Sequence, residues 1–503
     1  MFAALVTPLI EADRDLSGSA IRAAINTKLV TLGLQNTRMT DDFIYRVKKC
    51  SFIRVHGPRS QWFCQFRGWA DAVRAADADN IIVIEEADNV YIRCFVCLAI
   101  MRRLVRTELL RPICSIDAAH CKLPSSGQLV SLCSWDADNN LLLLAFGHVQ
   151  VESADNWSWF LFHCVSAMPT LASRHFVVIS DGDKGIAAAV MSVLPNSPHV
   201  LCAQHLLKHV LSKANTCEGG RKDLEKLFWQ AVRVCHPDYF VDLMQTMKVR
   251  HPSAFDYLTK EIALEKWAPA ALEVPRWGKL TSSLSESCNA SVLRYRSTPV
   301  PTMIDSIMVW STQRLINISA EMNSLPLMQL LVPSAKAALQ KAIDEGRTLT
   351  VRNANGGMAQ VSSMSRGPMC FHAVDISDNK LCTTSCCQRW KSTALPCRHM
   401  AALCRAVAVD PVSLVHSCYF VDTEKALLNA ALPARPVDTS QLTRDVHQML
   451  PPNEQKQRGA PKKRRIPSWH DETTEKKRVV KCGRCGEEGH YRRGCKVPLL
   501  SQQ

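Results

Sequence analysis

The stretch that decides the fold is His175-Phe176-Val177-Val178-Ile179-Ser180-Asp181-Gly182-Asp183-Lys184-Gly185-Ile186. An apolar, largely β-branched run enters an acidic turn that contains glycine, and an alanine-rich segment follows. Such a run is typical of a strand buried on both faces, and an acid at its C-terminal end points into the crevice where α/β proteins hold ligands. Taken alone, Asp181 or Asp183 is more simply explained as the cap of the following helix. A functional role requires other acids at the same place.

The composition of the chain limits the possible classes of protein. Its 503 residues are enough for roughly two to four domains, and a hydrophobic content of 47% supports a sizeable core. The net charge of +15 at pH 7 favours a polyanionic partner, nucleic acid before a membrane. No run approaches the roughly twenty apolar residues of a membrane span, and no signal peptide is expected. Twenty-two cysteines in such a chain favour thiols and metal ligands over disulfides.

Three apolar runs precede the opening stretch, and the short turn sequences between them predict an antiparallel meander. These runs are residues 113–116, which are followed directly by Asp117, then 129–135 and 141–148. An amphipathic helix from residue 155, capped by Ser153 or Asp155, leads into the strand that ends at Ser180. A second helix and a strand at 198–202 follow.

The predicted order is therefore β-β-β-α-β-α-β-α. Three antiparallel strands followed by βα crossovers give a mixed sheet flanked by helices, in the α/β class. This is the order of an RNase H-like fold. Asp117 and Asp181 are then expected to end strands on the same side of the sheet.

The rest of the chain divides by composition and periodicity. A largely helical, mixed region is expected at 1–110, with two strands at 80–85 and 89–96, before the α/β core at 111–300. An all-helical segment is inserted in this core at about 211–275, and a helical connector follows at 301–364. Small cysteine-containing modules are expected at 365–410 and 481–496, separated by a basic, proline-containing linker at 432–480.

Five short motifs occur in order along the core: Gln128-Leu129, Asp155-Asn156-Trp157-Ser158-Trp159-Phe160-Leu161, Ser180-Asp181-Gly182-Asp183-Lys184-Gly185, Cys202-Ala203-Gln204-His205 and Ser285-Glu286-Ser287-Cys288-Asn289. Together they resemble the Mutator-like element (MULE) transposases, whose arrangement the chain follows from about residue 60 to 405. The resemblance implies that Asp117, Asp181 and Glu286 are the DDE acids. The family often has Asn where this chain has Ser283.

DNA transposition is phosphoryl transfer, in which catalysis rests on positioning and charge neutralisation. Two divalent cations, Mg²⁺ or Mn²⁺, can bind the attacking and leaving oxygens, and they need carboxylate ligands. We hypothesise that Asp117 bridges both ions, Asp181 holds one and Glu286 the other. By periodicity alone Glu286 would be a solvated residue, because Leu284 and Cys288 define the apolar face of its helix. The resemblance also implies element ends and target DNA as partners, and a homo-oligomer during transposition.

The pair Cys202 and His205 opens a helix within the core. These residue types suggest a metal, but only two ligands lie nearby, and a buried polar pair under the site explains them equally well. Because the MULE family carries the pair, the resemblance implies a structural or DNA-contacting role.

The first C-terminal cysteine group resembles the SWIM zinc finger, which has the form C-x-C…C-x-H and commonly follows MULE domains. Tetrahedral zinc needs four ligands. The resemblance implies Cys387, Cys397 and His399, but the position of the first ligand is Ser385. Cys382 is the preferred substitute and Cys386 the alternative.

The second cysteine group has the spacing C-x2-C-x4-H-x4-C of a CCHC zinc knuckle, with the ligands Cys482, Cys485, His490 and Cys495. So short a loop cannot bury a core, and we expect it to fold only around Zn²⁺. Base stacking and phosphate contacts, typical of single-stranded nucleic acid binding, are expected from Tyr491, Arg484, Arg492 and Arg493.

Within the linker, a basic run predicts a nuclear localisation signal and hence the nucleus; it consists of Lys462, Lys463, Arg464 and Arg465. A solvated basic patch that adds phosphate affinity is a compatible explanation.

Three functions fit these patterns. The first is a MULE-type DDE transposase. The second is a catalytically inactive, domesticated DNA-binding regulator derived from one, and the third is a single-stranded nucleic-acid-binding protein dominated by its knuckle. Residues 1–60 are too short for a clear N-terminal DNA-binding module, which would fit a truncated copy.

Overall fold

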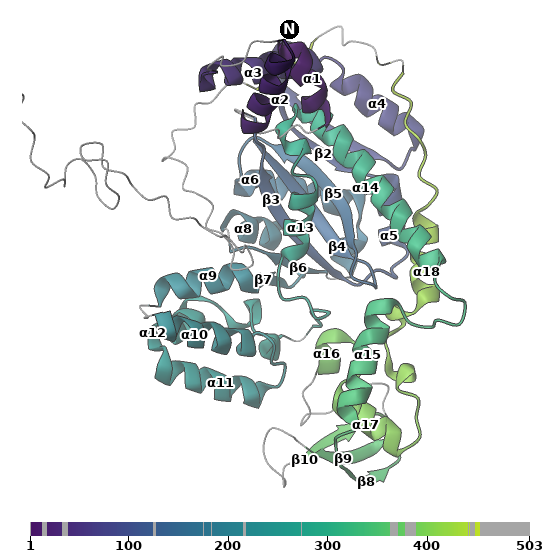
Figure 1. Cartoon of the computed structure of the whole chain (residues 1–503). Helices are drawn as coiled ribbons and strands as arrows, with labels where there is room; N and C mark the ends of the chain where they lie inside the picture. Colours follow the sequence, from purple (N-terminus) through teal and green to yellow (C-terminus); the bar gives the residue numbers. More distant parts are fainter. Residues whose placement is uncertain are drawn as a thin grey trace, which may run out of the picture. The chain divides into compact units, whose positions relative to one another are not determined.

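A seven-stranded mixed sheet organises the structure (Figure 1). The computed structural model describes residues 2–12, 18–32, 39–123, 127–174, 176–182, 184–214, 218–272, 274–362, 371–377, 389–440, 442 and 448–452. The strand order is β1-β2-β5-β4-β3-β6-β7. A mixed sheet with helices between groups of its strands agrees with the predicted α/β class.

The centre of the sheet is the expected meander of β3 (Ile113–His120), β4 (Gln128–Trp135) and β5 (Leu141–Val149). The opening stretch forms β6 (Val177–Ser180), and β7 (His199–Leu201) follows in parallel. Every residue of β6 is buried, as predicted for a strand covered on both faces. One detail differs from the sequence prediction. β3 continues to His120, so Asp117 lies within the strand and not at its end.

Two strands from the N-terminal region extend the same sheet. β1 (Ile81–Ala87) and β2 (Val90–Cys97) form a hairpin whose turn residues Asp88 and Asn89 have positive φ. β2 pairs antiparallel with β5, so that Val96 lies opposite Phe146. The core was predicted to begin at residue 111, but the sheet extends before that residue because β2 pairs with β5.

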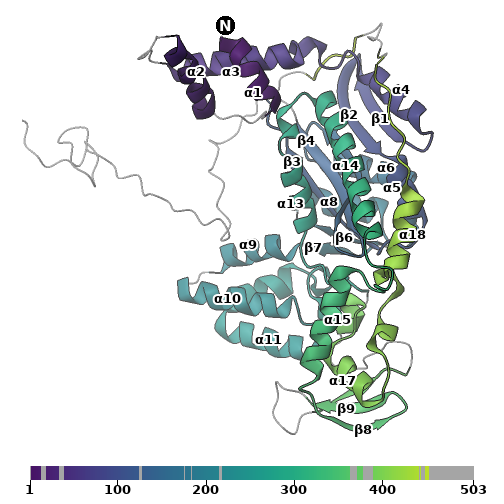
Figure 2. The ribbon, with the colours of Figure 1, turned by 45° about the vertical axis from the view of Figure 1, so that its right-hand side comes forward.

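Helices cover both faces of the sheet (Figures 1 and 2). α6 (Ala154–Ala167) and α8 (Lys184–Val193) pack together behind it, and α13 (Ser283–Ser291) and α14 (Val300–Asn323) lie in front. The Ser153 side chain accepts from Asn156 N, which settles the predicted alternative for the cap of α6. Shorter helices on this part of the chain are α4 (Phe66–Ala76), α5 (Ala99–Arg106) and α7 (Thr170–Ser173).

The helical insertion has a hydrophobic core of its own, which includes Leu206, Phe228 and Trp267. It begins with α9 (Ala203–Lys213), earlier than the sequence indicated. The remaining helices are α10 (Glu218–Ala231), α11 (Pro237–Arg250) and α12 (Pro252–Asp256), followed by the short turns η2 (Tyr257–Glu261), η3 (Leu264–Lys266) and η4 (Pro269–Ala271).

The two ends of the insertion are joined beside β7. Ala203 N donates to Leu280 O at 2.9 Å. The buried Arg276 guanidinium donates to Trp267 O at 3.1 Å and reaches Leu201 O at 3.5 Å. These bonds hold residues 276–280 beside the end of β7, and α13 begins shortly after them, at Ser283.

Three N-terminal helices form a separate small hydrophobic cluster around Val6, Ile25 and Ile44. They are α1 (Phe2–Ala12), α2 (Gly18–Thr31) and α3 (Asp41–His56), and the short turn η1 (Arg59–Gln61) follows. None of the helices in the described residues is long and apolar enough to cross a membrane.

The region after α14 differs from the predicted helical connector at 301–364. α15 (Pro333–Gly346) is helical, but β8 (Val351–Asn355) and β9 (Met358–Ser362) form a hairpin, to which β10 (Phe371–Asp375) adds. The hairpin turn uses Gly356 and Gly357 with φ of 56° and 91°, a conformation that glycine adopts without strain. The later helices are α16 (Arg389–Thr393), α17 (Arg398–Ala406) and α18 (Val421–Ala431), and η6 (Pro411–Leu414) and η7 (Ser417–Tyr419) lie between α17 and α18.

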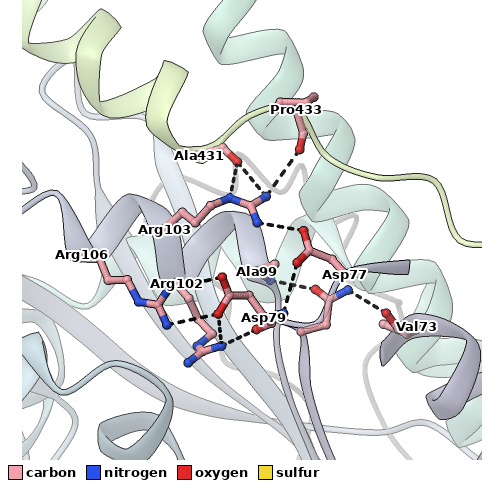
Figure 3. A network of polar contacts seen from close by, with 10 residues as sticks. Val73, Asp77, Asp79, Ala99, Arg102, Arg103, Arg106, Ala431 and Pro433 are labelled. Atoms are coloured by element: carbon pink, nitrogen blue, oxygen red, sulfur yellow. Dashed lines mark hydrogen bonds and ion pairs between the residues drawn. The ribbon is translucent and has the colours of Figure 1, made fainter. Parts of the chain in front are cut away.

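The described part of the predicted flexible linker is attached to the core. Arg103 of α5 bonds the Asp77 carboxylate at 2.8 Å and the carbonyl oxygens of Ala431 and Pro433 at 3.2 and 3.4 Å (Figure 3). Further along, Tyr91 N donates to Leu450 O at 3.0 Å, and Leu450 forms an isolated parallel bridge with Val90 at the start of β2. At Pro433 and Leu450, backbone carbonyls of the segment predicted as a linker therefore accept hydrogen bonds from residues of the core.

Candidate active site

Two of the predicted acids lie close together, one on β3 and one directly after the neighbouring parallel strand β6. β3 and β6 pair with Ser115 opposite Ile179. Extending this register by two residues places Asp117 beside Asp181, in agreement with the effect of the Asp181 charge on the Asp117 carboxyl. Asp181 directly follows the last residue of β6, as the opening stretch predicted. Because side chains two residues apart point to the same face of a strand, the register brings the two carboxylates to one place.

The electrostatics of Asp117 reflect this convergence. Burial raises the pKa of the Asp117 carboxyl, and the negative charge of Asp181 raises it further, with a smaller contribution from Glu286. The hydrogen bond from Ala118 N and the nearby His205 act in the opposite direction, and the resulting pKa is about 7. Carboxylates that repel one another at one site favour the binding of a cation there.

Glu286 reaches the site from the other side, on the first turn of α13. Its side chain is 47% exposed, and its Oε1 atom lies 3.6 Å from His205 Nε2. Leu284 and Cys288 are buried against the sheet, as the apolar pattern predicted. Glu286, which sequence periodicity assigned to solvent, is thus half exposed and also close enough to contribute to the pKa of Asp117.

A hydrogen bond between buried hydroxyls attaches α13 to β3. Ser285 Oγ lies 2.7 Å from Ser115 Oγ, two residues before Asp117 on β3. Neither serine has a role that the sequence predicts, because their pairing depends on how the helix docks on the sheet.

The Cys202 and His205 pair links the insertion to α13. Cys202 precedes α9 directly, and its Sγ atom accepts a hydrogen bond from Ser282 N at 3.2 Å. Burial raises the pKa of the Cys202 thiol, but hydrogen bonds with His205 and Ser282 outweigh burial and lower it. The pKa of His205 is raised, chiefly by its hydrogen bond with Cys202. This arrangement favours a structural role for Cys202 and His205, because the bond to Cys202 fixes Ser282, the residue before α13.

The described residues contain no group of three His, Cys, Asp or Glu side chains already arranged to hold a metal ion. The donor set nevertheless fits a hard divalent cation. Asp117 and Asp181 offer carboxylate oxygens, which Mg²⁺ and Mn²⁺ prefer, and a cation relieves the repulsion that raises the pKa of Asp117. Glu286, being half exposed, has room to adjust.

Asn289 is a site residue that the sequence analysis quoted in a motif without giving it a role. It lies three residues after Glu286 on α13, and its Nδ2 atom donates to Asp117 Oδ2 at 3.0 Å. The helical spacing from Glu286 was the one signal in the sequence that could have identified it.

Part of the predicted SWIM-like finger can be placed. Cys397 and His399 are both buried at the start of α17, and Cys397 Sγ lies 3.9 Å from His399 Nδ1. The His372 ring of β10 lies 5.0 Å from the His399 ring, centroid to centroid.

Several predicted site residues lie outside the described residues. They are Asp183, the SWIM-like candidates Cys382, Cys386 and Cys387, the basic run 462–465, and the whole CCHC group with Tyr491, Arg484, Arg492 and Arg493.

The fold and the paired acids define an α/β protein with a candidate cation site on its central strands. Residues 113–209 match the family model of the MULE transposase domain. The match runs from β3 to α9 and includes Asp117, Asp181, Cys202 and His205, whereas Glu286 lies beyond it. It supports the family resemblance and indicates a transposase-type function. No curated protein matches the chain.

Proposed function

We propose that this protein is a DNA transposase of the MULE type, which cuts and joins element DNA by phosphoryl transfer. The observation that carries the proposal is the proximity of Asp117 on β3 and Asp181 directly after β6, which the register of the two strands and the effect of the Asp181 charge on Asp117 both support, inside the segment that matches the MULE domain. Glu286 on α13 is the third acid. We also assign the sheet to the RNase H-like class, because β5-β4-β3-β6-β7 combines an antiparallel meander with two parallel crossovers.

In this proposal Asp117, Asp181 and Glu286 hold Mg²⁺ or Mn²⁺. When bound, the cation supplies charge neutralisation at the phosphate and lowers the pKa of a nucleophilic water. The chain itself supplies position. The shared register of β3 and β6 fixes two carboxylates, and α13 adds the third from a helix attached to β3 through Ser285. The half-exposed Glu286 leaves access for a DNA strand.

The remaining parts of the proposal concern partners and the C-terminal modules. The partners are element ends and target DNA, with the protein acting as a homo-oligomer in the nucleus. Zn²⁺ is bound by a SWIM-like finger that uses Cys382, Cys387, Cys397 and His399, and by the CCHC knuckle. The burial of Cys397 and His399 at one helix start supports the first of these zinc sites.

A second candidate function is a catalytically inactive DNA-binding regulator derived from a transposase. The presence of all three acids, Asp117, Asp181 and Glu286, argues against it. A third candidate, a single-stranded nucleic-acid-binding protein, rests on the knuckle motif alone.

Strand cleavage separates these functions. The purified full chain is incubated with a duplex that carries the terminal inverted repeat flanking its gene, in Mg²⁺ or Mn²⁺. We expect cation-dependent cleavage that falls at least a hundredfold in each of Asp117→Asn, Asp181→Asn and Glu286→Gln. The exposed Asp422→Asn on α18 is the matched control and retains wild-type cleavage. Near wild-type activity in any of the three acid variants removes that acid from the mechanism.

A further inference from the structure

One polar side chain of α13 contacts the central acid directly. Asn289 Nδ2 donates to Asp117 Oδ2 at 3.0 Å. The other end of the same amide, Asn289 Oδ1, is buried and has no hydrogen-bond partner among the described residues. A buried amide oxygen without a partner costs free energy and calls for an explanation.

The Asp117 carboxylate is held at both of its oxygens. Oδ1 accepts from Ala118 N at 2.9 Å, and Oδ2 accepts from Asn289. A carboxylate has about four acceptor positions in all, so each oxygen keeps one position for a cation. The two donors fix the carboxylate plane without occupying those positions.

The chemistry of the amide suits this task. A lysine or arginine at residue 289 would bring a positive charge that competes with a metal ion for Asp117. A second carboxylate would add to the repulsion that Asp181 and Glu286 already exert. An amide donates without a net charge, and its remaining oxygen is the type of ligand that hard divalent cations accept.

Docking of α13 does not depend on this contact. Ser285 bonds Ser115 on β3, and Leu284 and Cys288 are buried under the helix. Removal of the Asn289 amide therefore leaves the attachments that hold α13 in place.

We infer that Asn289 is a positioning residue of the acidic site, which orients the Asp117 carboxylate for a divalent cation. The inference rests on the proposed function, because it gives Asn289 a role toward the same site. Groups that orient metal ligands typically contribute 10–100-fold to metal affinity.

The test is Mn²⁺ binding to the full chain, measured by electron paramagnetic resonance of free Mn²⁺, with no DNA present. Asn289→Leu keeps a branched side chain that fills the space and removes the donor, and Asn289→Ala removes both. Ser287→Ala, exposed on the same helix, is the control. We expect both Asn289 variants to weaken Mn²⁺ binding at the acidic site about tenfold, with thermal unfolding unchanged relative to the control.

Each other result overturns the inference in a distinguishable way. Wild-type Mn²⁺ binding by Asn289→Leu together with weakened binding by Asn289→Ala means that Asn289 only fills space. A large fall in melting temperature in both variants means that it holds the fold. If wild type and Asp117→Asn bind Mn²⁺ equally, the acidic site of the proposed function is itself refuted, and the role of Asn289 falls with it.

Discussion

Replacement of Glu424 by glutamine should stabilise the protein at high pH and have little effect at low pH. Glu424 lies in the first turn of α18 and is 2% exposed. Its Oε2 atom accepts from Ala137 N at 3.2 Å, next to the fully buried Asp136. Arg111, also buried, is the cation of this cluster. Two carboxyls thus share one guanidinium in a region without solvent.

The magnitude follows from the pKa of Glu424. Burial raises it from an ordinary 4.5 to about 8, with a further contribution from the charge of Asp136. The folded state holds the Glu424 proton more tightly than the unfolded state does. The contribution of this proton to the free energy of unfolding is therefore fully present below pH 4.5 and is lost as pH rises through 8. Between pH 5 and 8.5 these values give a loss of about 4 kcal/mol. Since Asp136 titrates in the same cluster, we expect a measured difference of about 2–4 kcal/mol.

The assay is urea unfolding of wild type and Glu424→Gln at pH 5 and 8.5, followed by tryptophan fluorescence. Glutamine keeps an acceptor for Ala137 N and cannot ionise. The stability difference between variant and wild type should therefore grow with pH, whereas the exposed Glu321→Gln on α14 should show no such growth. If the free energies of unfolding of Glu424→Gln and wild type differ by the same amount at both pH values, the reasoning is refuted, because ionisation of Glu424 would then not destabilise the folded state.

Three further predictions concern ligands. Millimolar Mn²⁺ should raise the melting temperature of wild type but not of Asp117→Asn, because only a folded acidic site binds the ion; an equal rise in both places the ion elsewhere. Lys208, exposed one turn after His205 on α9, should contact a DNA phosphate. Lys208→Gln should reduce the slope of log affinity against log salt by about 0.9 for a duplex. Lys222→Gln on α10 is the control and should leave the slope unchanged. An unchanged slope in Lys208→Gln excludes the contact. The full chain should contain two zinc ions by elemental analysis, falling to one in Cys397→Ser and in Cys485→Ser; one or none in wild type refutes a zinc module.

Much of the central fold could be predicted because its signals are local. The run before Asp181 is apolar and β-branched, and turn residues separate the three strands of the meander before it. The order of strands and helices along the core was therefore predictable from sequence. The end of β3 was not, because the strand continues past Asp117 through pairing of Ala118 and Ala119 with Val130 and Leu129. Pairing of this kind depends on the partner strand and leaves no mark on the residues themselves.

The site was less accessible to prediction than the sheet. Periodicity placed Glu286 in solvent, and a family resemblance was needed to assign it a role. Asn289 and Ser285 act through contacts with β3, which exist only after α13 has docked. The same holds for Glu424, which meets Asp136 across a separation of nearly three hundred residues.

The central claim is that Asp117 and Asp181 form one divalent cation site. Anomalous diffraction from crystals of the full chain soaked in Mn²⁺ tests it most directly. The account predicts a peak in contact with carboxylate oxygens of both Asp117 and Asp181. A well-occupied peak elsewhere in the core, with none between these two residues, would contradict it.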